Sequence, residues 1–205
     1  LLSIVLGFFG GDHASQRVWT SILISGFFFF GVGLTGTFFL AIQYAAESGW
    51  PTVLKRIFEG VAAYLPIGSL ALIIVFLAGT FHFHHIYHWM DADLYDPASP
   101  HYDEIIAHKQ AYLNLPFWWI RTIAYLAVYI WFTMLFRKRS LMEDELTADP
   151  KPFFIKNQTL AAVFLVFFGY TSVTASWDWI MSIDTHWFST IFGWYIFSGM
   201  WISGM

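Results

Sequence analysis

The chain contains no cysteine and little charge. Charged residues make up 12% of its 205 residues, whereas hydrophobic residues make up 58% and aromatic residues 21%. A soluble domain carries about 25% charged residues, so this chain has too few to cover a water-facing surface. Without cysteine it has no disulfide, no thiolate ligand for an iron–sulfur cluster and no haem c attachment. The composition predicts a polytopic membrane protein in contact with lipid and not with nucleic acid, in which histidine, methionine or carboxylate would ligate any redox cofactor.

Long apolar runs divide the chain into expected membrane spans. A helix needs about 20 apolar residues to cross about 30 Å of hydrocarbon. Complete spans are predicted at 18–46, 61–81, 113–136 and 158–176, with partial spans at 1–9 and from about 187 onward. Only helices and closed barrels satisfy the backbone in lipid, so we predict an all-α transmembrane helical bundle, with 1–205 as one membrane region and no soluble domain. The chain begins without Met and stops inside an apolar run, so we expect it to be part of a longer protein.

Small residues and a proline predict how the spans pack. Pro66 removes a backbone donor and is expected to bend the second complete span near its start. Glycines let neighbouring helices approach closely, and they recur in the first complete span at Gly26, Gly31, Gly33 and Gly36.

One charge lies inside a span. Arg121 is part of the apolar run 113–136, where an unpaired charge is costly. We expect Asp178 or Asp184 as its partner, because these residues lie at the same end of the predicted bundle.

The two ends of the predicted bundle differ in composition. Loops 10–17, 82–112 and 177–186 form the histidine end, which holds all eight histidines and two cations. Loops 47–60 and 137–157 form the basic end, which holds seven lysines and arginines. The positive-inside rule places the basic end in the cytoplasm. Loops 82–112 and 177–186 are then expected to face the periplasm or its equivalent.

The densest group of histidines follows the second complete span. His84, His85 and His88 precede Asp91, where the apolar run meets an acidic loop. On a continuing helix His84 and His88 would share a face and, with a nearby aspartate, would suit a metal. No second motif supports a metal, and 14–81 and 109–185 contain no histidine as a bis-histidine haem partner, so neither is predicted. The open alternatives are interfacial anchoring and proton handling, which suits the release of protons from a quinol.

A second polar group follows the span 158–176. A row of hydroxyls at 171–176 leads to Asp178, Asp184 and His186, among three tryptophans. Hydroxyl rows carry hydrogen-bonded water, and carboxylates can end such a path. The alternative is a loop of interfacial aromatic residues with capping Ser and Asp.

Glu47 and Glu59 lie at the basic end and are candidates for proton entry from the cytoplasm. The alternative is ordinary solvation at the surface. No carboxylate lies at mid-depth in a complete span, so a continuous proton path would depend on Ser, Thr, Tyr and water.

Three segments together resemble a known family: 84–89 (HHIYHW), 109–121 (KQAYLNLPFWWIR) and 176–188 (SWDWIMSIDTHWF). They are similar to the ActF membrane subunits of bacterial alternative complex III, which are relatives of NrfD and of polysulfide-reductase membrane subunits. The sister ActC subunits share that architecture. The matching positions are His84, His85, His88, Arg121, Asp178, Asp184 and His186.

The resemblance implies a function in electron transport. The complex is a quinol:cytochrome c, or high-potential iron–sulfur protein, oxidoreductase of the bacterial inner membrane, in respiratory or photosynthetic chains. The resemblance implies a ten-helix NrfD-like subunit that contacts menaquinone or ubiquinone or conducts protons. Haems and iron–sulfur clusters would belong to partners, namely an iron–sulfur subunit and cytochrome c subunits beside an ActC-like membrane subunit. The alternatives are a non-catalytic scaffold of the same complex, a transporter and a haem b protein.

Overall fold

The computed structural model describes residues 11–144 and 151–205, and within these ranges it contains helices and turns and no β-strand. The α-helices are α2 (Asp12–Ala45), α3 (Lys55–Ala62), α4 (Leu65–Thr80), α5 (Glu104–His108), α6 (Leu115–Asp144), α7 (Lys151–Trp179) and α8 (Phe192–Gly204). Short 3-10 turns lie at Trp50–Val53, His88–Met90, Ala92–Tyr95 and Met181–Ile183. The all-α prediction is confirmed for the described residues.

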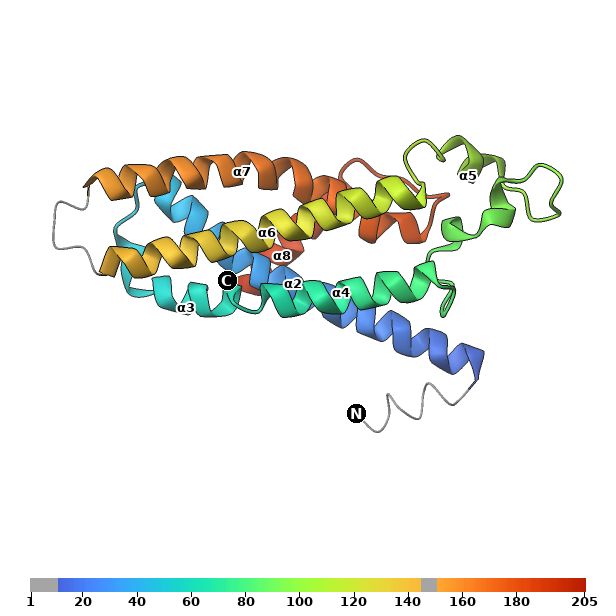
Figure 1. Cartoon of the computed structure of the whole chain (residues 1–205), viewed down its shortest axis with the longest axis horizontal. Coiled ribbons are helices and arrows are strands. Elements are labelled where there is room, and N and C mark those ends of the chain that lie inside the picture. The colour runs from blue at the N-terminus through green and yellow to red at the C-terminus, as the bar shows by residue number, and fades with distance from the viewer. Residues whose placement is uncertain (1–10, 145–150) are drawn as a thin grey trace.

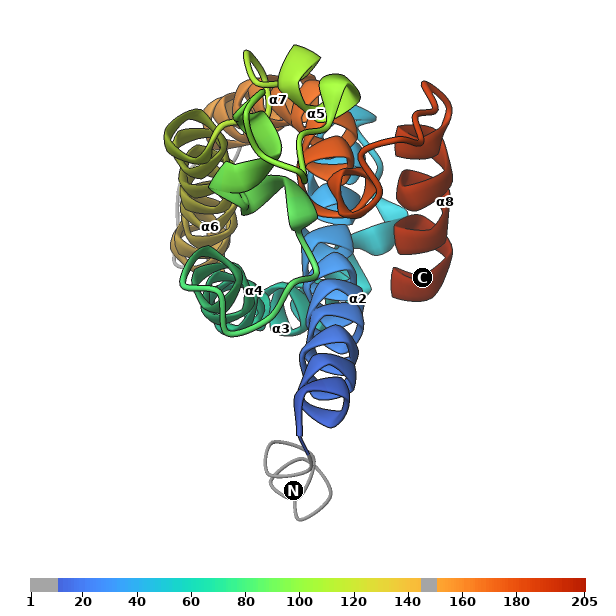
Figure 2. The ribbon, with the colours of Figure 1, turned by 90° about the vertical axis from the view of Figure 1, so that its right-hand side faces the viewer.

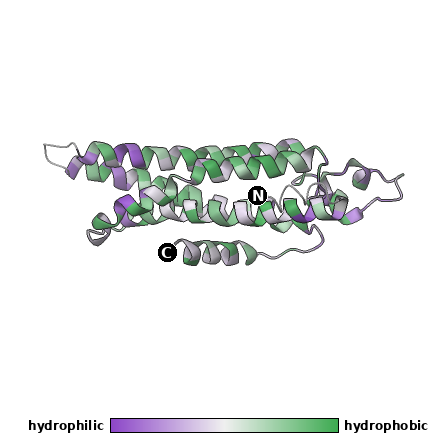
Figure 3. Ribbon diagram, turned by 90° about the horizontal axis from the view of Figure 1, so that it is seen from below, coloured by the Kyte–Doolittle hydropathy of each residue, from purple (hydrophilic) through white to green (hydrophobic). Residues whose placement is uncertain are grey.

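Four helical segments are long and apolar enough to cross a membrane: His13–Ala45, Lys55–Thr80, Leu115–Asp144 and Lys151–Ile183. They correspond one to one with the four predicted complete spans. The partial span predicted from about 187 contains α8, and the one predicted at 1–9 lies outside the described residues. The hydropathy colouring in Figure 3 shows apolar residues along the helix bodies and polar residues at both ends of the bundle.

The loop predicted at 137–157 is largely helical, which corrects its boundaries. Helix α6 continues to Asp144 and α7 begins at Lys151. Residues 137–144 include Arg, Lys, Leu, Met and Glu, which favour helix. Their charges also find partners: Glu143 accepts from Lys55, and Arg139 donates to Asn157. The low hydropathy of this stretch therefore marked the end of the apolar span and not the end of the helix.

Helix α2 is the central element, and it packs against α3, α4, α6, α7 and α8 (Figure 1). Seen from the histidine end, α8 lies on one side of α2, and α4 and α6 lie on the other (Figure 2). Gly36 allows α2 and α3 to approach closely, because a Cβ there would lie 2.8 Å from the carbonyl oxygen of Phe58 and 3.0 Å from the nitrogen of Ala62 in α3. The predicted role of the α2 glycines is confirmed at this position.

Pro66 marks the expected irregularity in the second span. Helix α3 ends at Ala62, and α4 begins at Leu65 with Pro66 in its first turn. Proline fits there because the first turn of a helix does not use its N–H groups. The span is therefore built from two helices.

Candidate functional site

The histidine end begins where α4 stops. The N–H of His82 donates to the carbonyl of Gly79 at 3.0 Å, and the N–H of Phe83 donates to that of Ala78 at 2.9 Å. This pair of bonds is the Schellman motif, in which the first residue past the cap adopts a left-handed conformation. His82 occupies that position with φ 57°. The helix therefore does not continue through the cluster, and His84 and His88 do not share a helical face, because the chain leaves α4 before reaching them.

His84 is a structural residue that fixes the loop after α4. Its Nε2 lies 3.0 Å from the carbonyl oxygen of Val75, and its Nδ1 accepts from the N–H of Ile86 at 3.3 Å. Its ring lies 5.3 Å from that of Trp19. The side chain is 3% exposed, and this burial lowers the pKa of His84 below its ordinary value. Both ring nitrogens are engaged, so neither is free to bind a metal, a haem or a substrate.

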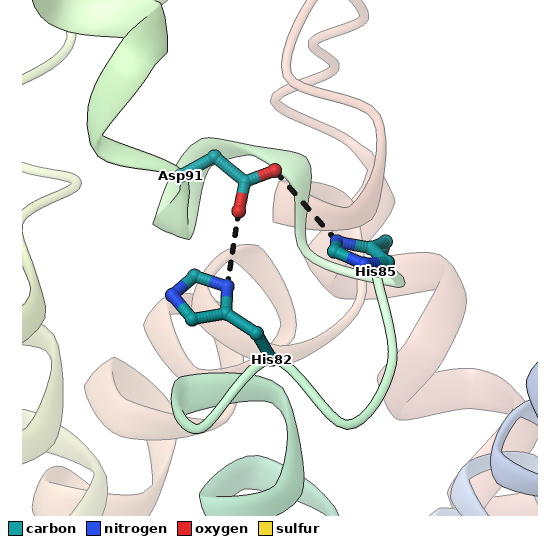
Figure 4. A group of neighbouring side chains, drawn as sticks. All are labelled: His82, His85 and Asp91. Atoms are coloured by element: carbon teal, nitrogen blue, oxygen red, sulfur yellow. Dashed lines mark ion pairs between the residues drawn. The ribbon is translucent and has the colours of Figure 1, made fainter.

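The neighbouring histidines point toward Asp91 (Figure 4). Nδ1 of His82 lies 3.1 Å from one carboxylate oxygen of Asp91, and Nδ1 of His85 lies 3.8 Å from the other. All three side chains reach solvent. Sequence analysis had placed His85 and Asp91 among the candidate residues but not His82, whose orientation depends on the left-handed turn.

Of the two predicted partners of Arg121, Asp178 forms the ion pair. Nε and Nη2 of Arg121 donate to the two carboxylate oxygens of Asp178 at 2.8 and 2.7 Å. The Asp178 side chain is fully buried and that of Arg121 is 10% exposed. The guanidinium also lies over the rings of Tyr112 and Phe117, at 4.0 and 4.2 Å from their centroids. The expected pairing is confirmed, and it joins α6 to the end of α7.

Hydrogen bonds also hold the backbone around Asp178. Its carbonyl oxygen accepts from the indole N–H of Trp118 at 2.8 Å and from the hydroxyl of Ser182 at 2.6 Å. The hydroxyl of Tyr87 donates to the carbonyl of Trp179 at 2.7 Å. These bonds tie the loop after α4 to the end of α7.

Asp184 and His186 belong to an exposed loop. The carboxylate of Asp184 accepts from the N–H of His186 at 3.1 Å, and Nε2 of His186 lies 2.7 Å from the carboxylate of Asp103. Asp103 also caps α5 by accepting from the N–H groups of Ile105 and Ile106, at 2.9 and 3.1 Å. The backbone N–H of Ile106, helped by His186, holds the pKa of Asp103 below its ordinary value. Sequence analysis identified neither the capping role of Asp103 nor its pairing with His186 across 83 positions.

These groups surround one hollow at the histidine end, which we call the polar basin, with a volume of about 820 Å³. Its lining includes five histidines and four aspartates: His82, His85, His88, His101, His186, Asp91, Asp93, Asp103 and Asp184. Sequence analysis named five of these nine residues as candidates and missed His82, His101, Asp93 and Asp103.

A second hollow lies beside the polar basin. This apolar cavity, of about 800 Å³, runs between α2, α7 and α8 and is lined mainly by Leu, Ile and Phe side chains. His85, His88 and Ile183 line both hollows. An apolar cavity with a few convergent polar groups is the usual form of a small-molecule site.

At the basic end, Glu59 is buried and not solvated. Its Oε2 accepts from Arg56 at 2.6 Å, while its Oε1 has no hydrogen-bond partner among the described residues. It lines a small cavity of about 170 Å³ together with Thr37 and Thr133. The solvation alternative is therefore wrong for Glu59. It fits Glu47, which is exposed and accepts from Gln158 at 2.8 Å.

Buried hydroxyl groups lie between the small cavity and the apolar cavity. The hydroxyls of Thr37 and Thr133 lie 2.7 Å apart, and that of Thr133 donates to the carbonyl of Tyr129 at 2.8 Å. The hydroxyl of Tyr129 lies 2.7 Å from that of Thr171, and Tyr129 lines the apolar cavity. Buried hydroxyls thus occupy the depth at which the spans have no carboxylate.

An all-helical chain with four apolar helices of spanning length supports a multi-pass membrane protein. No protein-family model matches the chain, and a search of curated proteins found no match.

Proposed function

We propose that this chain is an NrfD-like, ActF-type membrane subunit of a quinol-oxidising complex of the alternative complex III kind. Its partners would be an ActC-like membrane subunit, an iron–sulfur subunit and cytochrome c subunits, which carry the haems and clusters. It would reside in a bacterial inner membrane with the histidine end facing the periplasm. The observation that carries this proposal is the junction of the apolar cavity with the polar basin at His85 and His88.

A quinol needs both hollows. Its isoprenoid tail would need an apolar channel, and the apolar cavity between α2, α7 and α8 supports this role. Oxidation of the head releases two electrons to an acceptor in a partner subunit and two protons to nearby bases. His88 lines the end of the apolar cavity and is the first proton acceptor in this proposal. The His186–Asp103 pair, which also lines the basin, then passes the protons to water.

The occupant of the apolar cavity is tested by filling it. Gly199 lines the cavity, and a Cβ at this position would meet nothing within 4 Å. In Gly199→Leu the added side chain would occupy space needed by a quinol, so we expect a raised KM for quinol in the assembled complex. Gly169→Leu is the matched control, because Gly169 is also exposed, helical and unobstructed but does not line the cavity. Equal KM values for the two variants would contradict a quinol in this cavity.

The role of the basin is tested by His88→Gln and His186→Gln, with His108→Gln as the control outside the basin. We expect lower quinol:acceptor turnover, or a changed number of protons released per quinol, in the first two variants and not in the control. Assembly of each complex at wild-type levels is checked first. Unchanged turnover and proton release in both basin variants would instead favour the non-catalytic scaffold.

Proton conduction is a second candidate function, favoured by the hydroxyl row. Glu59 with its unpartnered oxygen would take up protons at the basic end. Thr37, Thr133, Tyr129 and Thr171 would carry them, with water, toward the apolar cavity. A cavity of about 170 Å³ has room for water beside Glu59.

This second function is tested in liposomes with a pH-sensitive dye inside. Tyr129→Phe removes the hydroxyl 2.7 Å from Thr171 and keeps the ring. We expect slower proton movement in Tyr129→Phe and in Glu59→Gln than in the wild type. Thr159→Val is the control, since the Thr159 hydroxyl lies in the same bundle but on an exposed face of α7. Proton movement at the wild-type rate in both path variants would exclude this route.

A further inference from the structure

Three side chains at the rim of the polar basin have the chemistry and the spacing of a metal site. His82, His85 and Asp91 each offer one ligand atom, and these three atoms lie within 4.8 Å of one another (Figure 4). We propose that they form a binding site for a divalent first-row transition-metal ion, with Zn²⁺ as the reference ion. This site does not depend on the proposed function.

The distances are close to those of a bound ion. Zinc binds imidazole nitrogen and carboxylate oxygen at about 2.0–2.2 Å, so the ligand atoms of a tetrahedral site lie about 3.3 Å apart. Nδ1 of His82 lies 3.1 Å from Oδ1 of Asp91, close to that spacing, and Nδ1 of His85 lies 3.8 Å from the other carboxylate oxygen, Oδ2. The three ligand atoms lie within 4.8 Å of one another, so movements of about 1.5 Å or less by these solvent-accessible side chains would complete the set.

The loop holds these ligands in place before a metal arrives. His82 is the left-handed residue of the Schellman motif, where glycine is the usual choice and a side chain adds strain. The buried His84 fixes the stretch between the two ligands through Val75 and Ile86. The N–H of His85 is further engaged by the side chain of Gln16, at 3.4 Å. His82 stands at a position that favours glycine, and its ring points at the carboxylate of Asp91. A metal ion bound by both side chains would explain why a histidine is found there.

The surroundings attract a cation and select its type. The described residues that line the basin include the further carboxylates Asp93, Asp103 and Asp184 and no lysine or arginine, so the local potential favours positive charge. Two imidazoles with one carboxylate suit zinc and its neighbours, whereas magnesium and calcium prefer oxygen ligands throughout. Three protein ligands leave at least one position for water or another group.

The test uses the full-length chain, in its complex where it is isolated as one, purified without a histidine tag. Co²⁺ is titrated and followed by its d–d absorption, and Zn²⁺ and Mg²⁺ are then added as competitors. We expect a tetrahedral-type Co²⁺ spectrum that Zn²⁺ removes and Mg²⁺ does not. We also expect binding to weaken by about tenfold or more in His82→Gly and Asp91→Asn.

Two controls keep the test decisive. His82→Gly retains the left-handed turn and relieves its strain, so the metal-free variant should melt no lower than the wild type while losing the metal-dependent rise in Tm. His186→Gln and His108→Ala remove other histidines of the same end and should keep wild-type Co²⁺ affinity. A wild type without a tetrahedral Co²⁺ spectrum, or wild-type affinity in His82→Gly and Asp91→Asn, would overturn the proposal.

Discussion

The histidine end and the basic end of the bundle both collect charged residues, but they arrange them differently. At the basic end Lys55 and Arg56 of α3 form ion pairs with Glu143 and Asp144 of α6 across a helix interface. The hollow found there, beside Glu59, is about 170 Å³. At the histidine end most imidazoles and carboxylates instead surround a hollow of about 820 Å³.

The two ends therefore use charged residues differently. Ion pairs join helices at the basic end, and imidazoles and carboxylates line a hollow at the histidine end. The ion pairs at the basic end join α3 to α6. At the histidine end the joining role falls to the buried Arg121–Asp178 pair, which leaves the exposed histidines and aspartates free to meet a proton, a cation or a substrate. A polar cluster is therefore a candidate site when its side chains line a cavity. A large number of polar side chains is not enough by itself.

The largest expected effect comes from Arg121–Asp178, a deeply buried ion pair among the residues that the structure describes. Arg121→Leu leaves the fully buried carboxylate of Asp178 without its counter-charge, so we expect a loss of about 3–5 kcal/mol of stability and poor accumulation in the membrane. Thermal unfolding in detergent and the amount of inserted protein measure this. The double variant Arg121→Leu, Asp178→Leu should recover much of the loss. A single variant as stable as the wild type would show that the pair does not join α6 to α7.

A smaller effect tests whether close packing holds the helices nearer the basic end. Gly36→Ala places a Cβ 2.8 Å from the carbonyl of Phe58, so we expect a loss of about 1–3 kcal/mol from the forced shift of α3. Gly169→Ala is the control, because a Cβ there meets nothing within 4 Å. Both changes gain the same helix propensity, and the difference between their Tm values isolates the contact. Equal Tm values would contradict the close approach of α2 and α3.

The ion pairs of the basic end should contribute little individually. Lys55 and Glu143 are partly exposed, at 18% and 27% of their side chains, so a double-mutant cycle with Lys55→Met and Glu143→Gln should give a coupling of about 1 kcal/mol or less. Quinol turnover should not change in either variant. A coupling as large as that of Arg121 with Asp178 would erase the difference between the two ends.

The smallest effect concerns pH at the rim of the basin. The pKa of Asp103 is lowered by the N–H of Ile106 and by His186, so the ionised carboxylate stabilises the folded loop above the ordinary value of 3.8. That contribution is lost as pH falls through the lower folded pKa. Amide hydrogen exchange at Ile105 and Ile106 should therefore quicken below about pH 4 beyond its intrinsic pH dependence. Asp103→Asn, which retains the cap oxygen, should lack this added change, and a wild type without it would contradict the assignment.

The predictions from sequence succeeded where one-dimensional pattern is enough. Apolar runs located four spans, because lipid demands about 20 apolar residues in a helix. Arg121 within such a run required a counter-charge, and Asp178 provides it. The extension of α6 to Asp144 was missed because hydropathy reports where lipid ends, whereas hydrogen bonding and helix propensity decide where a helix ends.

The composition of this chain by itself determined that it is helical and multi-pass, and the placing of its histidines determined which end would be rich in ionisable groups. Only the tertiary structure decided which of those groups line a cavity. It buried His84, turned His82 toward Asp91 and brought Asp103 to His186. The physical reason is that burial and spacing at a helix end depend on where the backbone turns and on what packs over it, and both are set by residues far apart in the chain.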